Sequence, residues 1–211
     1  MGRDFNKKRE SKKSCVLILE GYTERRYFYK MKEKKANEKK VEFDIKPELV
    51  SKKSIYEQYL IAKEKAADKH TTVFWLLDAD TIIKEYRESA DKNSSNLIQL
   101  KSIIEEIQKE RIENLKILLN TPCLEFWYLL HFVDTSRYYS KCELVCSELK
   151  RKELKDYQKS EKYYDQLYSK LLSRQEIALE RAKKLGAFDF ENPETAKAEI
   201  YRIIEFLQGD K

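Results

Sequence analysis

The chain contains two short runs of consecutive apolar residues, and each run ends in an acidic residue. The first, residues 15–19, reads Cys-Val-Leu-Ile-Leu and is followed by Glu20 and Gly21. The second, residues 72–77, combines β-branched, aromatic and aliphatic side chains and is followed by Asp78. Because neither run alternates apolar with polar residues, each predicts a strand buried on both faces, as in the centre of a parallel sheet.

Helical patterns alternate with these runs and with two weaker strand patterns. The predicted strands cover residues 15–19, 41–45, 72–77 and 116–119. One predicted helix covers residues 23–35, a second begins at residue 54, and a third covers residues 97–107. The polar stretch 81–96 is expected to be irregular, with residues 93–96 marking a loop or the start of a helix. This alternation indicates an α/β fold, with a mostly parallel sheet flanked by helices.

After about residue 135 the pattern becomes only helical, which predicts additional C-terminal helices. Asn192-Pro193 is expected to cap a helix whose buried face carries Ala196, Ile200, Ile203 and Leu207. Thr121-Pro122 is likewise expected to be the cap and first residue of a helix. We therefore predict an α/β core over residues 1–135, with a helical extension over residues 136–211 packing on it, although a separate C-terminal domain is an alternative.

The positive charge is concentrated near the N-terminus. The chain carries a formal net charge of +6, and basic residues gather in residues 1–13 and 25–40. These blocks are either a solvated tail and a solvated helix face, or part of a nucleic-acid-binding surface. In the second case, Arg25, Arg26 and Lys30 are the candidates for contacting phosphates.

Targeting and redox patterns point to the cytoplasm. No stretch approaches 18 consecutive apolar residues, and the N-terminus lacks the pattern of a secretory signal, so no membrane association is expected. We accordingly expect all four cysteines to be reduced. Cys142 and Cys146 share a helix face, and with Cys123 and His131 they suggest a zinc site. Their spacing matches no standard zinc signature, so buried free cysteines are the alternative.

Three acidic residues follow the two buried strands. Glu20 ends the first strand, and Asp78 and Asp80 follow the other; an extended chain would point both aspartates the same way. Because ligands bind at the carboxyl ends of parallel strands, we predict that the three carboxylates bind Mg²⁺ or Mn²⁺. Such a site suits phosphodiester cleavage. The alternative is that these acids merely cap helices.

Three longer segments resemble the RloB family, which belongs to the TOPRIM-like group. Residues 17–24 look like its Glu-Gly-x-x-Glu motif, and residues 75–80 contain the Asp-x-Asp element. Residues 120–132 resemble its Asn-Pro-x-Phe-Glu-x-Trp-x-Leu-Leu-His-Phe signature, from which the sequence departs at Thr121. The late Asn192-Pro193 element also matches, so the similarity spans roughly residues 10–207.

The resemblance implies a TOPRIM-type site. Glu20 would act as general acid/base or metal ligand, Asp78 and Asp80 as ligands, and Glu24 as the extra ligand of nuclease-type domains. Glu125 would lie near the metal if its helix begins at the carboxyl edge, or would only favour the helix dipole.

The family is associated with anti-phage defence, often beside an ABC-type ATPase. The leading hypothesis is therefore a metal-dependent nuclease of RNA or DNA acting in abortive infection. A non-catalytic nucleic-acid-binding or ATPase-docking module is the alternative. The oligomeric state stays open, and a homo-oligomer is one option.

Overall fold

The computed structural model describes residues 13–35, 41–45 and 53–208. Most of the basic N-terminal block and the end of the second basic block therefore lie outside the described residues. None of the described helices combines the length and apolar character that crossing a bilayer requires.

The sheet contains four parallel strands and a two-residue antiparallel strand, in the order β2-β1-β3-β4-β5. The strands are β1 (Lys13–Leu19), β2 (Val41–Ile45), β3 (Thr71–Asp78), β4 (Leu115–Thr121) and β5 (Lys197–Ala198). The four predicted strands are all present, which confirms the α/β fold with a mostly parallel sheet.

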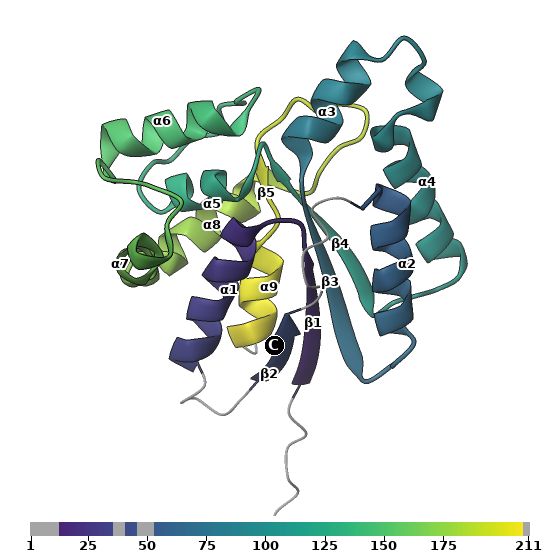
Figure 1. The fold of residues 1–211 in the computed structure, drawn as a ribbon, viewed down its shortest axis with the longest axis horizontal. Coiled ribbons are helices and arrows are strands. Elements are labelled where there is room, and N and C mark those ends of the chain that lie inside the picture. The colour runs from purple at the N-terminus through teal and green to yellow at the C-terminus, as the bar shows by residue number, and fades with distance from the viewer. Residues whose placement is uncertain (1–12, 36–40, 46–52, 209–211) are drawn as a thin grey trace, which may run out of the picture.

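Helices cover both faces of this sheet (Figure 1). They are α1 (Tyr22–Lys35), α2 (Ile55–Ala66), α3 (Ala79–Glu88), α4 (Asn96–Lys109), α5 (Leu124–Leu130), α6 (Cys142–Lys152), α7 (Glu161–Leu172), α8 (Gln175–Leu185) and α9 (Tyr201–Gln208), with a 3-10 helix, η2, at Lys92–Ser94.

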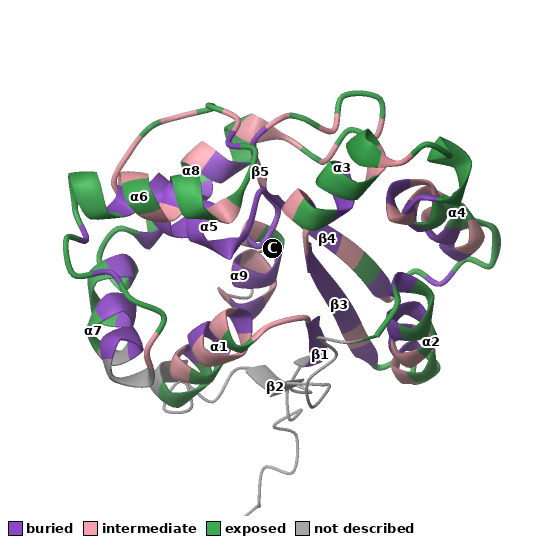
Figure 2. Ribbon diagram, turned by 45° about the horizontal axis from the view of Figure 1, so that its top comes forward, coloured by how far each residue is buried: buried purple, intermediate pink, exposed green. Residues whose placement is uncertain are grey.

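Two apolar clusters hold the layers together, one on each face of the sheet. Leu17, Leu76 and Leu118 face a cluster that includes α1 and α5 to α9. Ile18 and Trp75 face the other cluster, which includes α2, α3 and α4. The central strands are buried on both sides (Figure 2), as their continuous apolar runs require. The C-terminal helices share a core with the sheet, while a domain boundary at residue 135 stays a prediction.

The connections change direction across the sheet between β1 and β3. These two strands are hydrogen-bonded neighbours. The helix that follows β1, α1, packs on one face, whereas the helix that follows β3, α3, packs on the other. An open α/β sheet forms its ligand-binding crevice at such a reversal, outside the carboxyl ends of the strands. The fold therefore directs attention to the residues just after β1 and β3.

Three local predictions were wrong. Residues 81–88 continue α3 instead of being irregular, because Ile82 and Ile83 pack into the core. Thr121 is the last residue of β4, a cis peptide bond joins it to Pro122, and α5 starts only after Cys123.

The third concerns the segment after Asn192-Pro193. It forms β5 before α9 begins at Tyr201, because its backbone pairs with the end of β4. The side chains predicted to be buried there are buried nevertheless: Ala196, Ile200, Ile203 and Leu207.

Candidate metal centre

Five carboxylates lie around the carboxyl edge of β1 and β3. They belong to the loop after β1, the first turn of α1, the end of β3, the first turn of α3 and the first turn of α5. They are Glu20, Glu24, Asp78, Asp80 and Glu125, and their charges influence one another. The structure thus brings every acidic residue predicted for the site into one electrostatic group.

Glu20 is held in place by two donors. Its Oε1 accepts a hydrogen bond from Gln58 Nε2 at 3.0 Å, and its Oε2 accepts one from the backbone N–H of Asp78 at 3.3 Å. Gln58 is oriented in turn by Trp75, whose Nε1–H donates to Gln58 Oε1 at 3.0 Å. Burial raises the pKa of Glu20, both hydrogen bonds lower it, and the charge of Asp80 raises it again. Gln58, in α2, was not predicted from the sequence.

Glu24 is almost fully buried, and its Oε2 has no hydrogen-bond partner. Burial raises its pKa to about 7; its own backbone N–H lowers the pKa, Glu125 and Glu20 raise it, and Lys159 lowers it. The carboxylate lies so close to Gly21 that a Cβ there would collide with it. The glycine after Glu20 is therefore explained by the space that the Glu24 carboxylate occupies.

Asp78 is the last residue of β3 and pairs in register with Asn120 of β4. Its Oδ1 is buried without a partner, and so are both polar side-chain atoms of Asn120. Burial raises the pKa of Asp78 well above its ordinary value, and the charges of Glu24, Glu125, Glu20 and Asp80 add to that effect. Asn120, for which no special role was predicted, thus lies beside the group with unused hydrogen-bonding capacity.

Asp80 lies in the first turn of α3 and not on an extended chain, so the geometric reason given for pairing it with Asp78 was wrong. Its Oδ1 accepts from the N–H of Thr81 at 2.8 Å, and its Oδ2 accepts from the N–H of Cys142 at 3.3 Å. Burial raises its pKa, these two donors lower it, and Glu143 and Glu125 raise it. Asp80 therefore connects α3 to the start of α6.

Glu125 is 1% exposed and lies in the first turn of α5. Its Oε1 accepts from the hydroxyl of Tyr157 at 2.8 Å and forms an ion pair with Lys159 Nζ at 2.7 Å. Tyr157 and Lys159 come from the segment between α6 and α7, and no sequence pattern marked them. Lys159 places one positive charge against the acidic group.

One set of potential metal-ligand atoms is more closely spaced than the three carboxylates that follow the strands. Within residues 13–35, 41–45 and 53–208, the group of three metal-ligand atoms that all lie within 4.8 Å of one another is Cys123, Glu125 and Cys142. This group could hold a metal ion. The carboxylates of Glu20, Asp78 and Asp80 interact electrostatically without reaching that spacing.

Cys123 and Cys142 are joined by a disulfide bond. The expectation that all four cysteines are reduced was therefore wrong for this pair; Cys15 and Cys146 are free thiols. Of the residues considered for zinc, His131 lies apart from this pair. Its Nδ1 bonds to the carbonyl of Trp127 at 2.8 Å, and burial lowers its pKa to about 4.

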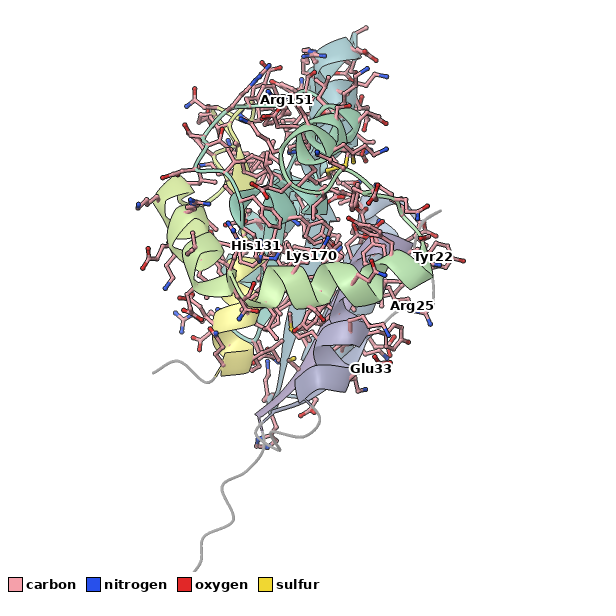
Figure 3. All side chains as sticks on the ribbon, turned by 90° about the vertical axis from the view of Figure 1, so that its left-hand side faces the viewer. Tyr22, Arg25, Glu33, His131, Arg151 and Lys170 are labelled. Atoms are coloured by element: carbon pink, nitrogen blue, oxygen red, sulfur yellow. A yellow bond between two sulfur atoms is a disulfide. The ribbon has the colours of Figure 1, made fainter. Side chains whose placement is uncertain are left out.

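The basic candidates belong to α1, and this helix lies beside α7 (Figure 3). Arg25 donates to the hydroxyl of Tyr29 at 3.2 Å, and Lys30 pairs with Glu33 at 2.9 Å. Arg26 donates to the backbone carbonyl of Lys159 at 3.3 Å. Arg26 thus supports the segment that carries the lysine of the acidic group, and phosphate contacts by these residues stay a prediction.

A sequence model of the RloB-like protein family matches residues 15–207, which is most of the chain. No curated protein and no solved structure matches it. The matched span includes all five carboxylates and the Cys123–Cys142 pair.

Proposed function

The chain belongs to the RloB-like family, and from this and the five grouped carboxylates we propose that it is a metal-dependent nuclease that hydrolyses phosphodiester bonds. The observation that carries the proposal is the pair of buried carboxylate oxygens without partners, Glu24 Oε2 and Asp78 Oδ1, inside a group of mutually repelling acids. Such a group either binds protons or needs a cation.

The donor set fits Mg²⁺ or Mn²⁺. The five side chains offer oxygen ligands, which hard divalent cations prefer. Glu20, Glu24, Asp78, Asp80 and Glu125 would hold the ion. When bound, it would polarise a phosphodiester and neutralise the charge that develops on the leaving oxygen.

Glu20 is suited to moving a proton. Its hydrogen bonds to Gln58 and to the backbone of Asp78 fix the orientation of its carboxylate. Burial raises its pKa, so that it exchanges a proton closer to neutral pH than an exposed glutamate does. A positioned carboxyl group with a raised pKa is an effective general acid/base. We assign Glu20 this role in addition to that of a ligand.

The substrate class proposed is RNA or DNA. The net charge of +6 favours a polyanion, and Arg25, Arg26 and Lys30 are the residues proposed to contact its phosphates. By the family resemblance, the protein would act in anti-phage defence together with an ABC-type ATPase.

A cleavage assay with a matched aspartate pair tests the proposal. Purified protein, with and without the proposed partner, an ABC-type ATPase, is incubated with labelled RNA and DNA in Mg²⁺ or in EDTA. We expect cleavage in Mg²⁺ that EDTA and Asp78→Asn abolish. Asp134→Asn, at an exposed aspartate, should leave cleavage unchanged.

Two results would contradict the nuclease proposal. One is the absence of cleavage even with the ATPase present, although the protein binds Mg²⁺. The other is cleavage that survives Asp78→Asn. Binding of nucleic acid that is insensitive to both EDTA and Asp78→Asn would instead favour the non-catalytic binding module.

A further inference from the structure

A second set of ligand atoms borders the carboxylates but differs from them in chemistry. Cys123 directly precedes α5, Glu125 lies in its first turn, and Cys142 begins α6. Their two sulfurs and one carboxylate oxygen all lie within 4.8 Å of one another. Cys123 and Cys142 are 19 residues apart in sequence, so two separate segments of the chain bring these ligand atoms together.

The two carboxylate oxygens of Glu125 differ in their hydrogen-bonding and ionic partners. Its Oε1 contacts the hydroxyl of Tyr157 and the ammonium of Lys159, whereas its Oε2 lies 3.0 Å from Cys142 Sγ. In the disulfide this sulfur carries no hydrogen and cannot donate. No other donor to Oε2 is found among the described residues, although Glu125 is 1% exposed. A buried carboxylate oxygen aimed at two sulfurs and lacking a donor is a position where a cation would be stabilised.

We propose that Cys123, Glu125 and Cys142 form a site for a thiophilic divalent cation of the zinc class when the two sulfurs are reduced, and that the disulfide between them empties this site. Two thiolates with one carboxylate suit Zn²⁺ far better than Mg²⁺, which avoids sulfur. Three protein ligands leave a coordination position for water.

A route for the ion and for small reagents is present. A surface pocket of about 290 Å³ is lined by Cys142, Glu143, Cys146, Ser147, Lys150 and Lys159. Cys142 therefore borders a space that a small molecule can enter, whereas the free thiol Cys15 is fully buried.

The two states interconvert by a balanced two-electron reaction. A peroxide takes two electrons from the zinc-bound thiolates and two protons from solvent; the S–S bond forms, the Zn²⁺ ion is released, and hydrogen peroxide becomes two waters. In the reverse direction, two thiols of an external reductant give their electrons and protons to the disulfide and become a disulfide themselves. The freed thiols lose their protons on binding Zn²⁺.

This site and the proposed nuclease site share Glu125. Zinc binding would hold Oε2 of Glu125 on the sulfur side, while the N–H of Cys142 bonds to Asp80. The zinc proposal itself does not require that the protein cleave nucleic acid.

Co²⁺ absorption spectra test the proposal, because thiolate ligands give Co²⁺ intense near-ultraviolet bands that oxygen ligands do not. The full-length protein is reduced with a phosphine, freed of metal and titrated with Co²⁺, then with Zn²⁺. We expect thiolate bands at one Co²⁺ per chain, which Zn²⁺ removes. Peroxide treatment should remove the bands and two of the four thiols, and reduction should restore both.

Variants identify the ligands. Cys123→Ser and Cys142→Ser should each weaken or abolish the bands, whereas Cys146→Ser, one helical turn away in the same pocket, should leave them unchanged. Absence of thiolate bands in the reduced wild-type protein would overturn the proposal, as would bands that persist after disulfide formation. The wild-type measurements stand even if a variant fails to fold. Asp78→Asn should retain the bands, so failure of the nuclease proposal and failure of this one are distinguishable.

Discussion

Replacing Glu24 by glutamine should stabilise the metal-free protein while weakening its stabilisation by metal. In the wild-type protein the Glu24 carboxyl is buried among other acids, and its Oε2 has no donor. Glutamine has nearly the same shape but no charge, and its amide N–H groups can donate to neighbouring carboxylates. A residue that serves only to stabilise the fold would not show these two opposite effects.

The magnitude follows from the pKa of Glu24. Burial and the neighbouring charges raise this pKa from 4.5 to about 7, which corresponds to about 3 kcal/mol. Because the folded-state pKa is the higher one, the contribution of the protonated group is complete below about pH 4.5 and is lost as the pH rises through about 7. Glu24→Gln should therefore gain up to about 3 kcal/mol at pH 8 and much less at pH 5.

Thermal unfolding in EDTA and in Mn²⁺ measures both effects. For a chain of this size, 1 kcal/mol shifts Tm by roughly 2–4 °C, so Glu24→Gln should raise Tm in EDTA at pH 8 by up to roughly 6–12 °C. Saturating Mn²⁺ at about 100 times its Kd should stabilise the wild-type protein by about 2.7 kcal/mol, and should stabilise the variant less.

Glu33→Gln is the matched control, because it lies on the same helix with a mostly exposed side chain. It should change neither the Tm in EDTA nor the response to Mn²⁺ by more than a degree or two. The reasoning is refuted if Glu24→Gln lowers Tm in EDTA at pH 8, or if Mn²⁺ stabilises this variant as strongly as the wild-type protein.

Three further outcomes are expected. Gly21→Ala should weaken Mn²⁺ binding in calorimetry without unfolding the protein, because its Cβ displaces the Glu24 carboxylate; unchanged affinity would contradict this. Lys159→Gln should lower the free energy of unfolding in EDTA by about 1.5–3 kcal/mol, the worth of a charged hydrogen bond, in urea titrations. His131 has its pKa lowered by burial from 6.5 to about 4, so its stabilising effect is present above pH 6.5 and is lost as the pH falls from there through about 4; wild-type stability should drop more steeply over this range than that of His131→Gln.

The strands and the acidic edge were predictable because their signals are local. Continuous apolar runs require burial on both faces, and parallel strands bring their carboxyl ends to one edge. Glu20 and Asp78 therefore had to lie near each other once the two runs were recognised as neighbouring strands. Their roles as ligands stay predictions. The helix at residues 79–88 was missed because its polar outer face hides the two isoleucines that pack inward.

The partners of the carboxylates were not predictable, because they come from distant segments. Gln58 is 38 residues from Glu20, and Tyr157 is 32 residues from Glu125. A single glutamine or tyrosine carries no pattern that reveals such a contact. The Cys123–Cys142 bond escaped prediction for a related reason: helix periodicity pairs Cys142 with Cys146, whereas the turn before α5 brings Cys123 to it instead.

Because Glu125 belongs to both proposed sites, metal binding at one site should weaken metal binding at the other. Its Oε1 is occupied by Tyr157 and Lys159, so only Oε2 is available to a cation on either side. If Zn²⁺ on the cysteines draws on Oε2, the carboxylate group loses one ligand, and Mn²⁺ should bind more weakly when Zn²⁺ is present. By linkage, Mn²⁺ must then weaken Zn²⁺ binding by the same factor. Equal Mn²⁺ affinity in the reduced protein with and without Zn²⁺ would show that Glu125 belongs to one site only.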